Sequence, residues 1–438
     1  MTWTVSDRHT ALDTWVGAGA EVVVIGGGIS GAGVLREFAY RGVRTLLIER
    51  DDFASGASSA SSKLVHGGLR YLSELNLRLT RTAIQERELL VEHNPNLVRE
   101  LPFLLLSDRG GLASLRLRAG LRLYGHLSRK SQATGMLPRN EWRRWLPAAE
   151  LNRVRAIATY CEAHADDARL VLETLKDART AGGEAIHHCP VVGFCRGANG
   201  RITGVRVYDR LRQRRHEIRC LLVVNTSGVE LDRIRELDAP HRSSVRPTKG
   251  THIVIPRAHL PLRSAIAFPA RDGRHLFAYP VGDGLLVGTT DTSVDDVDSK
   301  TPSAAECEYL LDGLRRFFPN STLGVNDIWS AWSGVRPLMA DPHRAVLTHK
   351  ISREHRIKED NSGLMSMAGG KLTTFRAMAE ELVDRALTRF PTTRRASLRA
   401  SHTATTPLRR DDFDRDEVTR RLINTYDIGP QTADRLIR

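Results

Sequence analysis

The chain has 438 residues, of which 41% are hydrophobic and 26% charged, a composition that predicts a globular protein of roughly two to three domains with a sizeable core. No run approaches the roughly 18 uninterrupted apolar residues of a membrane-spanning helix, and the segment from Met1 to Trp15 has neither the basic nor the apolar region of a secretory signal. The net charge of +14 favours an anionic partner, and the charge alone leaves nucleic acid, an anionic membrane surface and a phosphorylated substrate all open.

The first predicted elements form a dinucleotide-binding turn. Val22 to Ile25 is a fully apolar run typical of a buried parallel strand. Gly26, Gly28 and Gly31 then satisfy G-x-G-x-x-G at the turn into a helix that runs to about Arg41. The glycines allow the tight turn and the close approach of a pyrophosphate, and the helix N-terminus offers free N–H groups to the phosphates.

A second strand, Thr45 to Ile48, is expected to end at an acidic residue. Glu49 lies 23 positions after Gly26, about where a carboxylate must sit to bind a ribose hydroxyl. The helix carries Leu35 where many such helices have a small residue, and we expect this side chain to loosen the packing on the sheet. The pattern predicts an ADP-ribose site and leaves the choice between NAD and FAD open.

The next informative segment is SSASSKLVHGGLRYL, residues 58–72, in which hydroxyls, cations and a glycine pair are interleaved with leucine and valine. A surface loop would not need the apolar residues, and a core segment would reject the polar ones. The mixture therefore predicts a segment that is buried against a polar group.

From about residue 245 the pattern changes to the short apolar segments THIVIPR, AIAFPA, HLFAYPV and GLLVGTTD, separated by Pro, Gly and Asp. This spacing predicts an antiparallel sheet. Before it, LLVVNTSG at 221–228 has the form of another strand of the nucleotide domain, ending at Gly228.

Four stretches closely resemble the FAD-dependent glycerol-3-phosphate dehydrogenases: VVVIGGGISGAG, SGASSASSKLVHGGLRYL, KGTHIVIPR with GLLVGTTD, and WSGVRPLMAD through AGGKLTTFR. DDARLVLETL at 166–175 is also similar to this family, and the resemblance spans about 21–395. It implies a glutathione-reductase-type α/β flavoprotein, with a discontinuous Rossmann-like FAD-binding domain and an amino-acid-oxidase-like substrate domain built on an antiparallel sheet. In place of the family's longer helical cap we expect a short, truncated helical C-terminal segment.

The expected domain boundaries follow from this resemblance and the strand patterns. They are an N-terminal extension (1–20), the first segment of the FAD-binding domain (21–100), a helical, substrate-side insertion (101–164), the second segment of the FAD-binding domain (165–240), the substrate domain (241–343), the third segment of the FAD-binding domain (344–395) and the truncated helical cap (396–438).

The resemblance selects FAD as the cofactor. A protein segment that lies along FAD needs hydroxyls and N–H donors for the phosphates and for the edge of the flavin ring. It also needs small residues so that the backbone can approach the cofactor closely. The expected cofactor-binding residues are Gly26, Gly28, Gly31, Glu49, Ser58, Ser59, Ser61, Ser62, His66, Gly68, Gly228, Gly370, Leu372 and Thr373. For His66 the alternative is a histidine that merely satisfies backbone groups in a turn.

The resemblance also implies the reaction, oxidation of sn-glycerol 3-phosphate to dihydroxyacetone phosphate with the C2 hydride passing to flavin N5. The expected substrate-binding residues are Arg70, Tyr71, Thr290 and Arg353, and the expected catalytic residues are His252, Arg336 and Lys371. We favour His252 as the general base because its ordinary pKa is suitable, while a lysine desolvated beside other cations competes for this role. The alternatives are a strand histidine with a backbone partner for His252, and a structural ion pair for Arg70.

Electrons would pass to a membrane quinone, as in the family, from a cytoplasmic protein peripheral to the inner face of the membrane. Residues 111–130 predict a basic amphipathic helix with Arg118, Arg122 and Arg129 on one stripe, which either contacts an anionic membrane surface or is solvated over a leucine face. The five cysteines form no C-x-x-C pair and predict reduced, mostly structural thiols. Neither a metal nor a nucleic acid is expected.

Two departures from the family concern packing and association. Where the family continues LLVVNTSG into a Gly-Pro-Trp-like turn, this chain has Gly228, Val229 and Glu230. The family's helical cap is linked to association, so a homodimer is an expectation that the short C-terminal segment leaves open. The competing hypotheses are a flavin oxidase, a dehydrogenase of another small 2-hydroxy acid, a flavin-binding RNA-modifying protein, and an inactive truncated paralogue.

Overall fold

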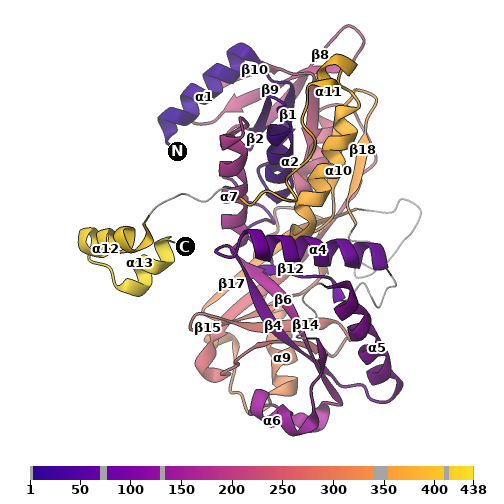
Figure 1. Ribbon diagram of the computed structural model, residues 1–438, viewed down its shortest axis with the longest axis vertical. Coiled ribbons are helices and arrows are strands. Elements are labelled where there is room, and N and C mark those ends of the chain that lie inside the picture. Colours follow the sequence, from indigo (N-terminus) through magenta and orange to yellow (C-terminus); the bar gives the residue numbers. More distant parts are fainter. Residues whose placement is uncertain (1–2, 70–75, 129–133, 340–353, 409–413, 438) are drawn as a thin grey trace.

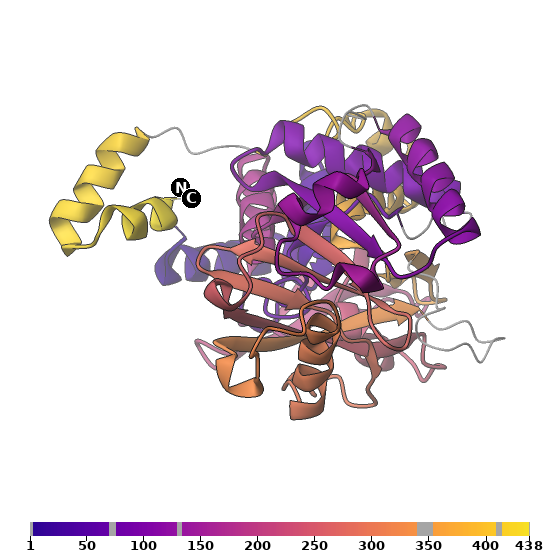
Figure 2. The same ribbon diagram turned by 90° about the horizontal axis from the view of Figure 1, so that it is seen from below.

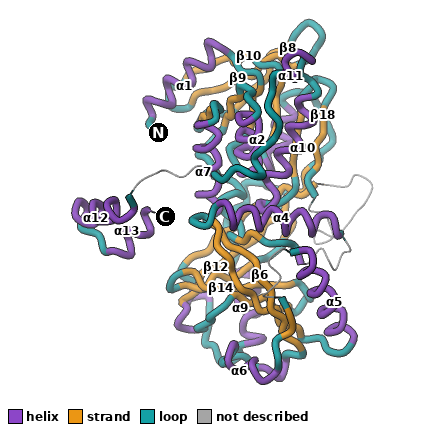
Figure 3. Tube along the Cα trace, viewed as in Figure 1, coloured by secondary structure: helices purple, strands orange, loops and turns teal. Residues whose placement is uncertain are grey.

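The computed structural model describes residues 3–69, 76–128, 134–339, 354–408 and 414–437. Two sheets follow one another along the long axis of the molecule, a six-stranded sheet in the upper half of Figure 1 and a ten-stranded sheet in the lower half. Figure 3 shows the same division by element type, with helices α2, α7 and α10 gathered around the upper sheet.

The six-stranded sheet is parallel except at one edge. In spatial order its strands are β18 (Arg356–Glu359), β19 (Met365–Ala368), β11 (Leu222–Asn225), β1 (Val22–Ile25), β2 (Thr45–Ile48) and β7 (Glu184–Ile186). Only β18 pairs antiparallel with its neighbour, β19. The strands from 21–50, from 221–228 and from the segment before Gly369 thus join one sheet, so the expected discontinuous α/β domain is confirmed.

Both faces of this sheet are covered, which explains why β1 is apolar at every position. Val22 and Val24 pack towards α2 (Ile29–Tyr40), α7 (Asp167–Thr180) and α10 (Phe375–Leu387). Val23 and Ile25 face the other way, because successive strand side chains point to opposite faces. The opposite face is covered by an antiparallel sheet and one helix: β10 (Arg214–Arg219), β9 (Ile202–Asp209), β8 (Val191–Arg196) and α1 (Val5–Ala18).

Leu35, expected to loosen the packing of α2, is fully buried. The space comes from Gly183, just before β7, where an added Cβ would lie 3.0 Å from Leu35 Cδ1. A glycine on the neighbouring segment therefore replaces the small residue that the helix lacks.

The ten-stranded sheet is mostly antiparallel. Along its main path the strands are β16 (Thr292–Ser293), β12 (Val245–Pro256), β15 (Gly284–Gly288), β14 (His275–Val281), β13 (Ala265–Pro269), β4 (Val98–Ser107), β6 (Ala156–Ala165) and β3 (Leu64–Val65), while β17 (Ser330–Met339) pairs with β12 and β5 (Gly135–Met136) with β6. The four segments predicted as antiparallel strands are β12 to β15. The insertion expected at 101–164 supplies two ten-residue strands, β4 and β6, as well as helices.

The remaining helices lie around these sheets. They are α4 (Leu77–His93), α5 (Leu112–Leu127), α6 (Trp142–Trp145), α8 (Leu231–Glu236), α9 (Ala304–Phe317), α11 (Thr392–Ala396), α12 (Arg415–Tyr426) and α13 (Pro430–Ile437), with 3₁₀ turns at Arg139–Glu141, Leu151–Arg153, Gly228–Glu230, Arg257–His259, Val325–Asp327 and Leu372–Thr374. Helices α12 and α13 pack on one another and lie apart from both sheets in two views (Figures 1 and 2). Among the described residues, no helix combines the length and the apolar character needed to cross a membrane.

Helix α5 is the basic helix predicted at 111–130, and its expected leucine face packs on the rest of the protein. Leu121 is only 2% exposed, and Leu117 and Leu127 also pack inward. The exposed leucines are instead Leu112, Leu115 and Leu123. Arg129 lies outside the described residues.

Candidate functional site

The glycine turn after β1 leaves no room for side chains. Gly26 has φ +107°, and a Cβ there would lie 2.8 Å from Ser227 Cα. A Cβ on Gly31 would lie 1.9 Å from the Gly26 carbonyl oxygen, so the first turn of α2 is pressed against the loop. The N-cap of α2 is Gly28, which has no side chain to satisfy the first N–H groups of the helix. A side-chain partner comes instead from Ser58, whose Oγ accepts from Ile29 N–H at 2.9 Å.

Glu49 closes the same site at the end of β2. Its Oε2 accepts from Gly27 N–H at 2.5 Å, and its Oε1 accepts from Asp51 N–H at 2.8 Å. Burial raises the pKa of Glu49, while these two N–H groups act in the opposite direction. The carboxylate is thus held beside the glycine turn, the position that a ribose hydroxyl requires.

Residues 58–69 run from this turn into the ten-stranded sheet, where Leu64 and Val65 form β3 on β6. The serine hydroxyls of this segment make specific contacts. Ser61 Oγ donates to Asp167 Oδ2 at 2.6 Å, Ser62 Oγ lies 3.0 Å from His252 Nε2, and Ser59 Oγ makes a long contact of 3.4 Å with the Gly56 carbonyl. The apolar residues therefore anchor the segment to one sheet while its polar residues connect it to both domains, which explains its mixed composition.

His66 meets the segment that follows β19. Lys371 Nζ lies 3.3 Å from His66 Nδ1, and His66 N–H donates to Thr373 Oγ1 at 3.1 Å. Leu372 and Thr373 belong to the 3₁₀ turn that leads into α10. Gly370 has φ +78°, and a Cβ there would lie 2.4 Å from Met378 Sδ, so this residue must be glycine for reasons of backbone and packing.

His252 is deeply buried on β12. Its ring is 1% exposed and stacks on Trp332, with centroids 5.4 Å apart, and its Nδ1 has no hydrogen-bond partner among the residues that the structure describes. Burial lowers the pKa of His252 to about 3, and the charges of Arg336 and Lys63 act in the same direction. The imidazole is therefore neutral at physiological pH, with one buried nitrogen available to a ligand.

Arg336 lies across the backbone of β12. A Cβ on Gly250 would fall 2.1 Å from Arg336 Nη2, so the guanidinium occupies the space above this glycine. The same nitrogen donates to Thr289 Oγ1 at 3.0 Å, and Nη1 lies 3.4 Å from Asp291 Oδ1. The hydroxyl of Thr290 is turned towards Thr251 N–H, from which it accepts at 2.9 Å.

These contacts connect most of the predicted residues into one site. Lys371 touches His66, Ser62 of the same segment touches His252, and His252 and Arg336 lie on the paired strands β12 and β17. Gly228, with φ +64°, begins the 3₁₀ turn after β11, and Gly68, with φ +79°, follows β3. The expected substrate-binding residues Arg70, Tyr71 and Arg353 lie outside the described residues.

Sequence reasoning missed three residues that shape this site. Asp167 Oδ1 accepts from Lys63 Nζ at 2.5 Å, so Asp167 holds both Ser61 and this lysine. Trp332 supplies the face on which His252 stacks. Lys63, Asp167 and Trp332 each lie in a stretch that resembles the family, which is a usable signal for their importance, but no local pattern indicates which distant residue each of them contacts.

The low pKa of His252 predicts acid sensitivity. Between a folded pKa of about 3 and an unfolded value of 6.5, the unfolded chain binds a proton that the folded chain does not. The free energy of unfolding should therefore fall as the pH drops through this window, by about 2 kcal/mol between pH 6.5 and 5 for this group. We expect the free energy of unfolding of His252→Gln to fall less than that of the wild type, by about this amount, when urea denaturation is compared at pH 7 and pH 5.

The exposed His126 on α5 provides the control. His126→Gln removes a histidine whose side chain is exposed to solvent and should leave the acid dependence of unfolding as in the wild-type chain. Equal acid dependence in His252→Gln and wild type would contradict the neutral, buried state of His252.

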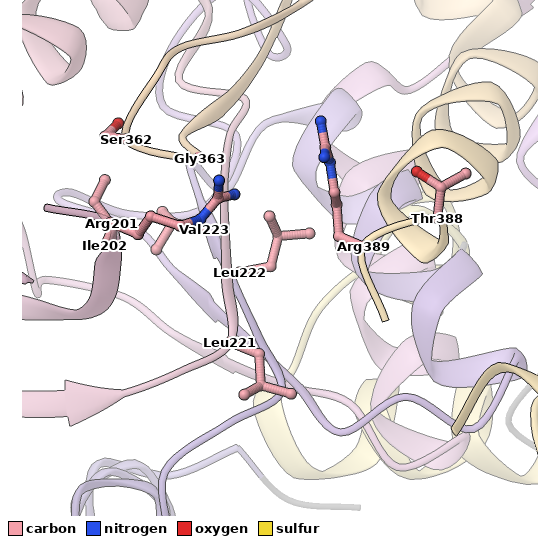
Figure 4. Close-up of a pocket in the computed structure, with 9 residues that line it drawn as sticks. All are labelled: Arg201, Ile202, Leu221, Leu222, Val223, Ser362, Gly363, Thr388 and Arg389. Atoms are coloured by element: carbon pink, nitrogen blue, oxygen red, sulfur yellow. The ribbon is translucent and has the colours of Figure 1, made fainter. Parts of the chain in front are cut away.

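One hollow of the molecule lies away from this site. A hollow of about 360 Å³ lies beside the amino end of β11 and is lined in part by Arg201, Ser362 and Arg389 (Figure 4). Because β11 is parallel to β1, this hollow lies at the opposite end of the strands from the glycine turn. It contains no residue predicted for cofactor or substrate. Within the described portion of the chain, no three His, Cys, Asp or Glu side chains are grouped to hold a metal ion.

The donor set and space fit a flavin dinucleotide. The glycine turn has room only for backbone, the first turn of α2 offers N–H groups to phosphates, and Glu49 lies beside them. At the other end of residues 58–69, His66, Lys371 and the unpartnered Nδ1 of His252 supply polar groups between the two sheets.

Comparison with known proteins gives a consistent result. Residues 21–385 match the family of FAD-dependent oxidoreductases. Over 372 residues the chain is 37% identical to the aerobic glycerol-3-phosphate dehydrogenase of Staphylococcus saprophyticus, an alignment that covers 83% of this chain and 66% of that protein. The chain thus spans slightly less than two thirds of the length of this relative.

Solved structures show the same fold. The glycerol-3-phosphate dehydrogenase from Bacillus halodurans complexed with FAD superposes with a TM-score of 0.74 at 29% identity, covering 98% of this chain and 77% of that one. The L-alpha-glycerophosphate oxidase from Mycoplasma pneumoniae with FAD bound gives a TM-score of 0.67 at 16% identity, covering 83% of this chain and 94% of that one. The second likeness shows the fold alone.

Proposed function

Because this chain belongs to the family of FAD-dependent oxidoreductases, with FAD as cofactor, we propose that it oxidises sn-glycerol 3-phosphate to dihydroxyacetone phosphate. The observation that carries the proposal is the connected set of Lys371, His66, Ser62, His252 and Arg336 between the two sheets. When bound, FAD supplies the two-electron acceptor for the hydride that leaves C2 of the substrate.

The resemblance implies that Arg70 contacts the phosphate, and we assign Arg336 to the phosphate as well. The guanidinium of Arg336 is a rigid fork of donors that suits a phosphate better than a point charge does. Its carboxylate neighbour Asp291 is 3.4 Å away, which is long for a charge-assisted hydrogen bond. Arg70, Tyr71, Thr290 and Arg353 remain proposed substrate-binding residues on the strength of the resemblance.

We assign acceptance of the C2 hydroxyl proton to His252. A general base needs an available lone pair, and His252 is neutral across the physiological range, but its pKa of about 3 in the free protein is well below the ordinary histidine value that favours this role. Burial lowers its pKa most, but Arg336 and Lys63 contribute, and a dianionic phosphate bound at Arg336 would offset that contribution. The substrate would thereby raise the basicity of the group that deprotonates it. Lys371 remains the competing base.

The cofactor assignments rest on the same geometry. Gly26, Gly28, Gly31, Gly228 and Glu49 would hold the ADP half and Ser58 the pyrophosphate side. Residues His66, Gly68, Gly370, Leu372 and Thr373 would contact the flavin half. Ser59, Ser61 and Ser62 make contacts with the protein itself, so any contact of theirs with FAD would be additional to these.

The test is a visible spectrum of the purified, FAD-loaded protein before and after anaerobic addition of sn-glycerol 3-phosphate. We expect the absorption band of oxidised flavin to bleach, because the two electrons removed from C2 must appear on the cofactor. Glycerol, which lacks the phosphate, and lactate, a small 2-hydroxy acid, are the matched controls and should leave the band unchanged. An unbleached flavin with sn-glycerol 3-phosphate, or equal bleaching by lactate, would contradict the proposed substrate.

We further propose a membrane quinone as the electron acceptor and α5 as the contact with an anionic membrane surface. Three exposed leucines, Leu112, Leu115 and Leu123, follow one face of α5, and Arg116 and Arg122 flank them. At 100° per residue the leucines fall within one 80° arc with an arginine on either side, the pattern of an interfacial helix. Helix α5 also lies at the periphery of the molecule (Figures 1 and 2).

The acceptor can be tested in the bleached sample. Anionic vesicles containing a quinone should restore the oxidised flavin band faster than the same vesicles without quinone. A faster recovery in air than with quinone vesicles would indicate an oxidase instead.

A further inference from the structure

A buried charged cluster lies directly behind residues 66–68. Glu162 on β6 is 4% exposed, and its Oε2 accepts from Gly67 N–H at 2.6 Å. Arg87 of α4 places Nη1 3.1 Å from the same oxygen, and Tyr124 of α5 places its hydroxyl 3.4 Å from both carboxylate oxygens. Arg87 also donates to the Tyr124 hydroxyl at 2.8 Å, so the three side chains form one closed network.

This network explains why residue 67 is glycine. A Cβ on Gly67 would fall 2.2 Å from the Tyr124 hydroxyl and 2.9 Å from Arg87 Nη1. The side-chain space at this position is therefore occupied by the cluster. The first glycine of the pair is needed for contact with the protein interior, a different reason from close approach to the cofactor.

The N–H group of His66, next to that of Gly67, is held by a different part of the chain. His66 N–H donates to Thr373 Oγ1 at 3.1 Å, while Gly67 N–H donates to Glu162. Two consecutive peptide groups are thus held by acceptors from the turn before α10 and from β6. These two bonds fix the backbone from which the His66 side chain reaches Lys371.

Stability alone is a weak reason for such a cluster. Removing a carboxylate and a guanidinium from water costs free energy, and apolar residues of similar size often replace a buried ion pair without loss. Burial raises the pKa of Glu162, and Arg87 acts against that shift. An apolar pair, however, could not accept a hydrogen bond from Gly67 N–H and so could not fix the direction of this peptide group.

We infer that Glu162, held by Arg87 and Tyr124, is a positioning residue that orients residues 66–68 for the flavin. This inference rests on the proposed FAD site and does not depend on the identity of the substrate. Glu162 acts through Gly67 and His66 and need not touch the cofactor itself.

The experiment measures the FAD dissociation constant, the shape of the bound flavin spectrum and the flavin midpoint potential. Glu162→Gln should weaken FAD binding about tenfold, because a charged acceptor of the Gly67 N–H becomes neutral. The double variant Arg87→Met with Glu162→Met should weaken FAD binding at least as much while its thermal midpoint stays close to that of the wild type, since both partners of the closer ion pair are removed. Glu88, which lies 3.8 Å from Arg87, keeps its hydrogen bond from Ser128. Both variants should also alter the flavin spectrum.

The matched control is Asp209→Asn, which breaks the Arg8–Asp209 pair, buried to 0% exposure on both side chains. It should lower the thermal midpoint and leave the FAD dissociation constant and spectrum of the folded protein unchanged. The inference is overturned if the double variant binds FAD with wild-type affinity and spectrum, or if Asp209→Asn shifts both as much as Glu162→Gln does. None of these measurements uses substrate. A failure of sn-glycerol 3-phosphate to reduce the flavin would therefore contradict the proposed substrate without contradicting the role of Glu162.

Discussion

Arg336→Ala is expected to lower kcat/KM for sn-glycerol 3-phosphate by about 10²- to 10³-fold, the size expected when one partner of a desolvated charge pair is removed. The guanidinium lies in the site across Gly250 and beside His252, so its loss removes the proposed phosphate ligand. Arg336→Lys should restore little of the activity because a lysine cannot make the bidentate contact. Steady-state kinetics with an artificial acceptor would measure both variants.

Two further variants separate the role of Arg336 from general effects. Gly250→Ala should reproduce most of the loss, because its Cβ would displace the guanidinium, whereas Arg246→Ala changes an exposed arginine on the same strand and should leave kcat/KM near the wild-type value. Comparable activity losses in Arg246→Ala and Arg336→Ala, or an unchanged kcat/KM in Arg336→Ala, would contradict the assignment of the phosphate to Arg336.

Gly31→Ala is expected to abolish FAD retention and to destabilise the apoprotein by about 3 kcal/mol, an overpacking cost that the rigid loop cannot relax. The added Cβ would lie 1.9 Å from the Gly26 carbonyl oxygen and 2.9 Å from Thr226 Oγ1, so α2 would have to move away from the turn that binds the pyrophosphate. Urea denaturation of the apoprotein and the flavin content of the purified protein would measure the two effects.

A glycine-to-alanine substitution at an open position should instead raise the free energy of unfolding. Gly17 lies in α1 with nothing within 4 Å of an added Cβ, and Gly17→Ala should stabilise the chain by about 0.5 kcal/mol through helix propensity. Full FAD retention by Gly31→Ala would contradict the close packing of α2 on the glycine turn.

The local features of the nucleotide domain follow directly from the amino-acid sequence. The strands Val22–Ile25 and Thr45–Ile48 begin and end at the predicted residues, and the glycine turn and Glu49 lie where the spacing placed them. These features could be predicted because a buried strand, a tight turn and a helix N-terminus each depend on residues close together in the chain. The four antiparallel strands from residue 245 onwards were predictable for the same reason.

Contacts between distant side chains could not be predicted from the sequence and become visible only in the folded protein. Gly67 and Glu162 are 95 positions apart, and Ser61 and Asp167 are 106 positions apart, so no local pattern pairs them. Burial first, and then the charges of its distant neighbours Arg336 and Lys63, lower the pKa of His252 and keep it neutral. The outward face of α5 likewise depends on which leucines its neighbours cover. Burial and contact between distant segments arise only when the two sheets are packed together, and it is this packing that turns residues 58–69 into a site.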